Sequence, residues 1–221
     1  PMYGVIIAFK DFSLGKGIFL SPWNNFRHFT RLFNDPSFLL VLRNTVIINL
    51  YFMIFGFPAP IILALLINEI INVKFRKIVQ SISYLPTFLS WVILADMIIE
   101  FLSPQSGPVN YLLSLIGIKP IYFLTEKMLF RGLIVGTGIW ASVGWNSVIF
   151  LASITSIDQQ IYEAAIIDGA NRLQRAIYIT LPSIMPVVMF IFLMDISAIL
   201  GSNFDQVFNL INASVMEVGY V

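Results

Sequence analysis

Four long stretches without a charged side chain constrain this chain more than any other feature of its sequence. The stretches run over residues 44–68, 78–95, 132–157 and 176–194. Because a helix needs about 20 mostly apolar residues to cross the hydrocarbon core of a bilayer, each stretch predicts one membrane span. With their flanking apolar residues, the predicted helices cover residues 38–68, 78–102, 130–156 and 178–202.

Composition agrees with a membrane protein. Hydrophobic residues make up 58% of the 221 positions and charged residues only 11%, whereas soluble domains carry roughly 25% charged residues. A soluble fold of this size has too little interior to hide so much apolar surface, so lipid must solvate part of it. The predicted fold is therefore an all-α, polytopic transmembrane helical bundle.

The same composition excludes several classes of function. The formal net charge is +1 and no basic stripe is present, which argues against binding to nucleic acid. The chain has no cysteine and one histidine, so we expect no thiol chemistry and no metal site. It also lacks the phosphate-binding pattern G-x-x-x-x-G-K-[ST], and we expect no catalytic residues.

The segments between the spans indicate orientation. Lysine and arginine are denser in the connectors 69–77 and 156–175 than in the loops 10–37 and 103–131. Because short cytoplasmic loops are enriched in basic residues, the two connectors are predicted to be cytoplasmic and the two loops to be outside. The second outer loop is rich in proline and glycine, with a short helix expected at 109–116.

The ends of the sequence read as cuts within a larger protein. The chain begins at Pro1, and residues 1–9 resemble the end of an apolar segment. We expect residues 1–221 to be a fragment, forming a single transmembrane domain that continues beyond both ends.

The segment 156–175 is the most polar connector between the predicted spans. A helix is predicted to start after Ser156, whose spacing to Gln159 fits a capping box, or after Asp158 as the alternative cap. It is expected to end at Gly169. A second short helix is predicted near Asn171.

Two further features complete this prediction. The proline at position 182 suits the first turn of the following span. Ile161, Ala164, Ala165 and Asp168 share one helical face, whose small residues permit close approach to another surface. Two short helices around a glycine would form a rigid docking knob.

This connector resembles a known family. Glu163-Ala164-Ala165, followed by Gly169 and then by Ile179-Thr180-Leu181-Pro182, resembles the EAA loop of binding-protein-dependent ABC importer permeases. Other stretches resemble the polysaccharide-permease (LplB-type) branch of the sugar importers. They are PMYGVIIAFKDF (1–12), LRNTVIINL (42–50), FGFPAPIILALLINEI (55–70), SYLPTFLSWV (83–92), YEAAIIDGAN (162–171) and NFDQVF (203–208).

The resemblance implies a fold, a location and partners. It implies the type I permease fold in the bacterial cytoplasmic membrane, with four complete spans of an expected six in this chain. It implies import of oligosaccharides or polysaccharide fragments together with a second permease subunit, two cytoplasmic ATPase subunits and an extracellular or periplasmic solute-binding protein. ATP and magnesium would bind to the ATPase subunits, and this chain would bind no cofactor.

The resemblance also implies which residues couple the chain to the ATPase. Glu163 would pair with a basic residue of the ATPase, Ala164 and Ala165 would pack into its groove, and Gly169 would set the bend. The full set of predicted coupling residues is Tyr162, Glu163, Ala164, Ala165, Asp168, Gly169, Leu181 and Pro182.

Polar residues within or near the spans are candidates for a substrate pathway. Ionisable groups at membrane depth are costly and usually face a cavity or a partner, which nominates Asp96 and Asp195. Asp96 and Glu100 lie four residues apart on one helical face, and hydration at the membrane boundary is the alternative for both. Asp195 departs from the resembled pattern, where a basic or neutral residue is expected.

Further pathway candidates come from amides and aromatic rings. Asn146 beside Trp145 suits a sugar, with an interhelical hydrogen bond as the alternative. Phe204, Asp205 and Gln206 are predicted at the outer end of the last span, where a plain helix end is the alternative.

Two structural expectations accompany these candidates. The helix 38–68 is expected to break around Gly56, Pro58 and Pro60. Trp91 is expected at the membrane interface, together with Trp23 and Trp140.

Three other functions remain open from the sequence. An ABC importer for another solute, such as glycerol phosphate or a peptide, fits the same EAA loop. A polytopic membrane enzyme would need charged or histidine side chains clustered at one membrane face. A membrane scaffold would need no coupling loop at all.

Overall fold

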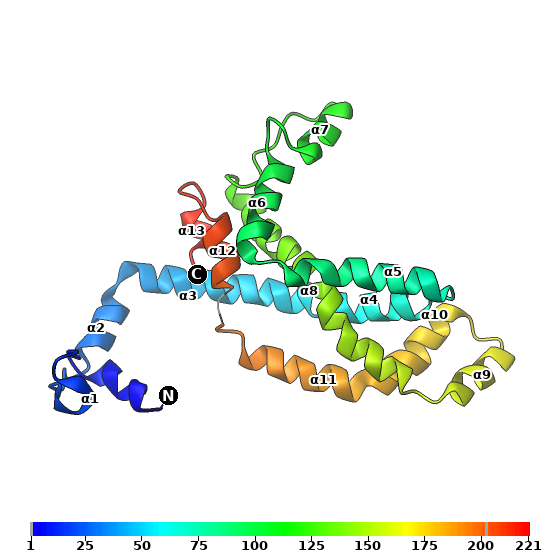
Figure 1. The fold of residues 1–221 in the computed structure, drawn as a ribbon, viewed down its shortest axis with the longest axis horizontal. Helices are drawn as coiled ribbons and strands as arrows, with labels where there is room; N and C mark the ends of the chain where they lie inside the picture. The colour runs from blue at the N-terminus through cyan, green and yellow to red at the C-terminus, as the bar shows by residue number, and fades with distance from the viewer. Residues whose placement is uncertain (1, 202) are drawn as a thin grey trace. The chain divides into compact units, whose positions relative to one another are not determined.

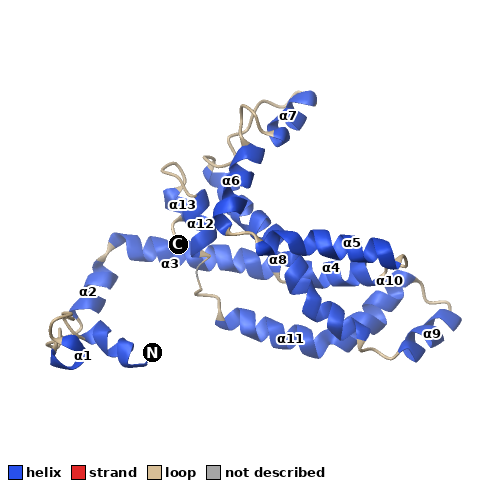
Figure 2. Ribbon diagram, viewed as in Figure 1, coloured by secondary structure: helices blue, strands red, loops and turns tan. Residues whose placement is uncertain are grey.

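A computed structural model describes residues 2–201 and 203–221. The described chain consists of helices joined by loops (Figure 2). One isolated antiparallel bridge joins Lys10 to Trp23. The chain divides into two compact units, residues 1–44 and residues 45–221. The prediction of an all-helical fold is confirmed.

The first unit is built from short helices. It contains a 3-10 helix (Met2–Phe9), α1 (Gly17–Leu20), α2 (Arg27–Asn34) and the start of α3 (Pro36–Tyr51). The Lys10 Nζ atom donates to the carbonyls of Ile18 and Phe19, each at 2.9 Å, which holds α1 in place. The expected outer loop 10–37 is thus a folded segment with helices of its own.

The first predicted span is confirmed. A helix runs over Pro36–Asn68 as α3, a π-helical turn (Phe52–Gly56) and α4 (Pro58–Asn68). The Phe57 N–H donates to the Phe52 carbonyl at 3.0 Å, five residues back. Pro58 and Pro60 have no N–H for the hydrogen-bond ladder, so the wider turn forms where a break was predicted.

The second predicted helix, over residues 78–102, is wrong as a single helix, because the structure breaks it in two. α5 (Val73–Tyr84) continues into a 3-10 turn (Leu85–Phe88), and α6 (Trp91–Leu102) follows at an angle of 107°. Leu89 and Ser90 are extended, and the Ser90 side chain accepts from the Ile93 N–H as the cap of a new helix. Pro86 together with this serine cap outweighs the apolar composition.

The third predicted span is confirmed as α8 (Lys127–Thr155), which contacts α4, α5 and α11 (Leu181–Ser197) (Figure 1). Gly144 of α8 lies directly against α5. A Cβ atom at position 144 would sit 2.0 Å from the Ser83 carbonyl oxygen. The two helices therefore approach closely because position 144 carries no side chain.

The last predicted span, residues 178–202, differs from the structure at both ends. The helix covers Arg172–Ser197 as α10 (Arg172–Arg175), a π-helical turn (Ala176–Thr180) and α11. The capping box of Asn171 with Gln174 starts this helix early. The expected second short helix of the docking knob is therefore the first turn of the span. Position 202 lies outside the described residues.

By length and composition, three helices in the described residues suit a membrane span, or four if α5 and α6 together make one. The remaining helices are α7 (Pro108–Leu115), α9 (Gln159–Ile167), α12 (Phe204–Leu210) and α13 (Met216–Gly219). α7 confirms the short helix expected at 109–116. Phe204, Asp205 and Gln206 begin the separate helix α12, which contacts α6 and α8, so their predicted place at the end of the last span is wrong.

Buried apolar side chains gather in two clusters. One joins α4, α8 and α11 through Ile61, Ala64, Phe150, Ile154, Ile184 and Val188. The other joins α3, α6, α8, α12 and the chain's C-terminal part through Ile48, Ala95, Ile98, Phe130, Ile134, Val207, Leu210 and Val215.

Candidate functional site

Helix α9 follows α8 in the chain and precedes the helix Arg172–Ser197, and specific residues fix both of its ends. The Asp158 Oδ1 atom accepts from the Gln160 N–H at 3.0 Å, so Asp158 caps the helix. The Ser156 hydroxyl instead donates to the Ser153 carbonyl at 2.7 Å. After the helix, Gly169 adopts φ +80°, a left-handed conformation that favours glycine. The predicted turn at Gly169 is confirmed, and of the two predicted caps Asp158 is the one used.

The two sides of α9 differ in exposure. Glu163, Ala164 and Asp168 are exposed, whereas Tyr162 and Ala165 are half-buried. The Tyr162 hydroxyl lies 2.8 Å from the Thr180 Oγ1 atom, within hydrogen-bonding distance. The side of α9 that carries Tyr162 and Ala165 therefore packs against the rest of the protein. The side that carries Glu163 and Ala164 is exposed and accessible to a partner protein.

The start of the following helix completes this region, which we call the coupling segment (residues 156–182). Leu181 is half-buried and packs against the α4–α8–α11 cluster, while Pro182 is exposed. The Arg172 Nε atom lies 3.9 Å from the Glu69 Oε2 atom, an exposed ion pair to the connector after α4. A small hollow of about 300 Å³ lies beside Asp168 and Gly169.

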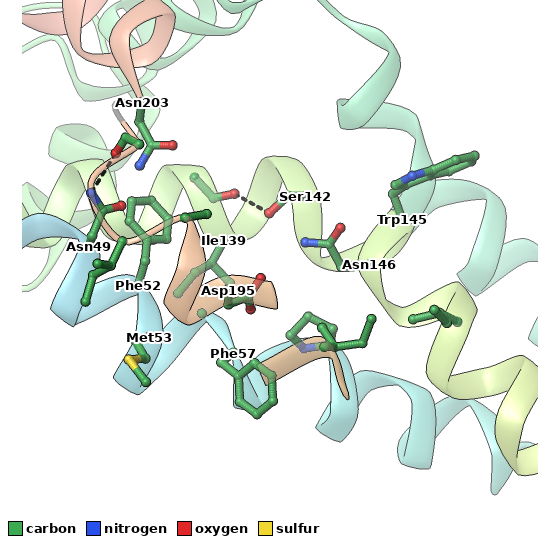
Figure 3. Close-up of a pocket in the computed structure, with 18 of the residues that line it drawn as sticks. Asn49, Phe52, Met53, Phe57, Ile139, Ser142, Trp145, Asn146, Asp195 and Asn203 are labelled. Atoms are coloured by element: carbon green, nitrogen blue, oxygen red, sulfur yellow. Dashed lines mark hydrogen bonds between the residues drawn. The ribbon is translucent and has the colours of Figure 1, made fainter. Parts of the chain in front are cut away.

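A larger cavity of about 850 Å³ opens between α3, α4, α8 and α11 (Figure 3). We call it the central cavity. Its polar lining residues are Asn49, Ser142, Asn146, Asp195, Asn203 and Gln206. Its aromatic lining residues are Phe52, Phe57, Trp91, Trp145 and Phe150.

The structure brings together three of the predicted pathway residues. Asn146, Asp195 and Gln206 line the central cavity. Asp96, Phe204 and Asp205 are not among its lining residues and are exposed. Outside the cavity, Glu100 accepts a hydrogen bond from the Ser106 hydroxyl at 3.2 Å.

Gln206 and Trp145 both interact with other side chains or backbone groups of the protein. The Gln206 side chain is 2% exposed, and its Nε2 donates to the Ile134 carbonyl at 2.6 Å and to Thr137 Oγ1 at 2.9 Å. These bonds fasten α12 to α8. The Trp145 ring packs edge-on against Phe88, with ring centroids 5.9 Å apart.

Among the lining residues that were not predicted as pathway residues are three polar ones and a tryptophan. Asn49 donates from Nδ2 to the Gly201 carbonyl at 2.8 Å, and Ser142 and Asn203 also line the cavity (Figure 3). Trp91, expected as an interfacial anchor, also lines the cavity. An amide inside the apolar run 44–68 was the available signal for Asn49. The places of the other three depend on tertiary packing.

The lining has a definite chemical character. Amides and a hydroxyl offer donors and acceptors, and aromatic rings offer apolar faces, a combination that suits the hydroxyls and C–H faces of a sugar. Among the described residues that line the cavity, Asp195 is the one ionisable side chain.

The sequence is similar to a transporter family and to two proteins of known name. Residues 56–203 match the family described as "Binding-protein-dependent transport system inner membrane component". The chain is 40% identical to the polygalacturonan/rhamnogalacturonan transport system permease protein YteP of Bacillus subtilis (strain 168), covering 100% of this chain and 69% of YteP. It is 38% identical to protein LplB of the same organism, covering 99% of this chain and 70% of LplB.

A solved structure agrees in fold. A bacterial ABC transporter involved in the import of the acidic polysaccharide alginate contains a chain that matches with a TM-score of 0.89 and 39% identity. The match covers 100% of this chain and 74% of that chain.

Proposed function

This chain belongs to the binding-protein-dependent inner membrane permease family of ABC importers, and from that premise we propose that it conducts oligosaccharides or polysaccharide fragments across the membrane. It is a multi-pass component of the inner membrane and not an enzyme. In such systems the ATPase is a separate subunit, which holds the ATP and magnesium.

The observation that carries the proposal is the form of the coupling segment. α9 is held at one end by the Asp158 cap and turned at the other by Gly169. Its Glu163–Ala164 side is exposed, while Tyr162 holds it to the following span. Such a short, rigid helix is suited to enter a groove of the ATPase, with Glu163 facing a basic residue there.

The central cavity supplies the place for the substrate. YteP is named for polygalacturonan and rhamnogalacturonan, and the similar solved chain belongs to an importer of alginate. These names, together with the amides and aromatic rings of the lining, support a saccharide as the cargo. Asn146 and Asp195 would contact it directly, because both side chains line the cavity.

The complete importer would contain further chains. We infer a second permease subunit across the pathway, two ATPase subunits on the side of α9, and a solute-binding protein on the side of residues 10–37 and 103–131. Residues 1–221 would then act as one transmembrane permease domain. Alternating access would follow from the different affinities of the ATPase dimer for two arrangements of the bundle.

A pull-down from detergent tests this assignment. The tagged protein, expressed in its own operon context, is purified as wild type and as Gly169→Asp, and the chains that accompany it are identified by mass spectrometry. At φ +80° an aspartate is strained and adds charge at the turn, so the variant should lose the ATPase and keep the second permease.

Gly117→Asp is the matched control. Gly117 also has a positive φ (+78°), and neither glycine has any atom within 4 Å of the position of an added Cβ. The control therefore carries the same strain on the loop 103–131 and should keep the ATPase. Purification of the wild type without an ATPase, or retention of the ATPase by Gly169→Asp, would contradict the proposal.

A further inference from the structure

We propose that the hydrogen bond between Tyr162 and Thr180 is the link through which α9 moves the span Arg172–Ser197, and that the π-helical turn Ala176–Thr180 is the hinge of that span. The proposal rests on the function proposed above for the coupling segment. It makes Tyr162 and Thr180 a positioning pair, neither of which contacts the substrate.

The contact lies on the inner side of α9. Tyr162 is half-buried, whereas its neighbour Glu163 points to the exposed side. The Tyr162 hydroxyl and the Thr180 Oγ1 atom are 2.8 Å apart although 18 residues separate them in the chain. Thr180 is 2% exposed, so water does not compete for this bond. A displacement of α9 therefore reaches Thr180 directly.

Thr180 lies at the end of an irregular turn. The Leu181 N–H donates to the Ala176 carbonyl, five residues back, which defines the π-helical turn. The Thr180 hydroxyl also lies 3.3 Å from the Arg175 carbonyl, across the same turn. π-helical turns interrupt the regular ladder and are frequent at functional sites.

Two prolines weaken the helix just beyond this turn. Pro182 and Pro186 carry no N–H, so each leaves one carbonyl of the preceding turn without its ladder donor. The stretch from Ala176 to Pro186 therefore has fewer backbone bonds than the rest of the helix, and bending there costs less. Tyr162 therefore contacts the helix Arg172–Ser197 within the stretch that bends most easily.

The remainder of α11 extends from the hinge to the central cavity. Ile184 and Val188 are buried against α4 and α8, so a tilt of α11 is felt by both helices. Asp195 is 15 residues beyond Thr180, which is about 22 Å along a helix that rises 1.5 Å per residue. One helix thus joins the coupling contact to the cavity wall.

The test measures coupling rather than assembly. The complete transporter is reconstituted in liposomes with its solute-binding protein, and the number of saccharides imported per ATP hydrolysed is determined. Tyr162→Phe and Thr180→Val each remove one partner of the bond and should lower this ratio roughly three- to tenfold. The double variant should be no worse than either single variant, because the same bond is lost.

Two controls separate coupling from folding. Thr180→Ser keeps the hydroxyl and should restore the ratio to near the wild-type value. Thr155→Val removes a hydroxyl that donates to the Ala152 carbonyl within α8 and should leave the ratio unchanged.

Three results would overturn the inference: an unchanged ratio in both single variants, multiplied losses in the double variant, or loss of the ATPase from Tyr162→Phe or Thr180→Val. An ATPase absent from the wild-type complex would instead refute the proposed function.

Discussion

The coupling segment and the central cavity are built in opposite ways. The coupling segment is one continuous stretch whose helix starts and turns are set by residues a few positions apart, such as Asp158 with Gln160 and Asn171 with Gln174. The cavity wall draws on residues from Asn49 to Gln206, and its shape depends on how distant helices pack. A substitution in the first region should change stability locally, while one in the second should change the stability of the whole bundle.

The largest expected effect tests the packing of α8 against α5. Gly144→Leu places a side chain into the Ser83 carbonyl, a backbone group that cannot move aside. We expect a loss of stability above about 3 kcal/mol and almost no folded protein in detergent. Gly136→Leu is the control on the same helix, because an added Cβ there meets no atom within 4 Å. Equal yields of the two variants would contradict the close crossing of α8 and α5.

A smaller effect is expected where α12 is fastened to α8. Gln206→Leu leaves the Ile134 carbonyl without its side-chain donor and removes the bond to Thr137. The loss should be about 1–3 kcal/mol, seen as a lower midpoint of thermal unfolding in detergent. Asn209→Ala, whose amide bonds the Asp205 carbonyl in its own helix, should change the midpoint much less.

The carboxylate of Asp195 in the central cavity should influence which saccharides bind there. An ionised Asp195 repels an anionic saccharide, by about 1 kcal/mol for unit charges 4 Å apart in water. Asp195→Asn should therefore raise binding of a uronate oligosaccharide roughly fivefold relative to a neutral one of equal length. Equilibrium dialysis of both saccharides against the purified transporter measures this ratio. Equal changes for the two saccharides would show that Asp195 does not sense charge.

The smallest effect is expected from a cap in the coupling segment. Asn171→Ala removes the side chain that accepts from the Gln174 N–H and should cost about 1 kcal/mol of local helix stability. Hydrogen exchange should rise in residues 172–175, while exchange in α8 stays as in the wild type. Faster exchange throughout α8 would mean that the two regions are not independent.

Features that depend on neighbouring residues could be predicted from the sequence, whereas features that depend on how distant helices pack could not. Gly169 was predicted as a turn because only its own conformation matters, and the structure gives it φ +80°. The break in the helix predicted over 78–102 was missed because apolar composition says nothing of the bend at Leu89–Ser90. Ser142 and Asn203 were missed as cavity residues, since neither position is distinguished until the helices pack. Asn146 and Asp195 were found because a polar side chain in an apolar helix is unusual wherever it points.

The bend between α5 and α6 has a consequence for the surroundings of the chain. With 12 residues each, α5 and α6 are about 18 Å long, short of the roughly 30 Å of hydrocarbon. Backbone amides at a break cannot face lipid tails, where each unpaired group costs several kcal/mol. The Thr87 hydroxyl donates to the Ala141 carbonyl beside this break, and Trp91, one residue past it, lines the cavity. Because lipid tails cannot pair with the peptide groups at Leu89 and Ser90, protein or water must surround this bend, and we expect it to border the pathway rather than the lipid.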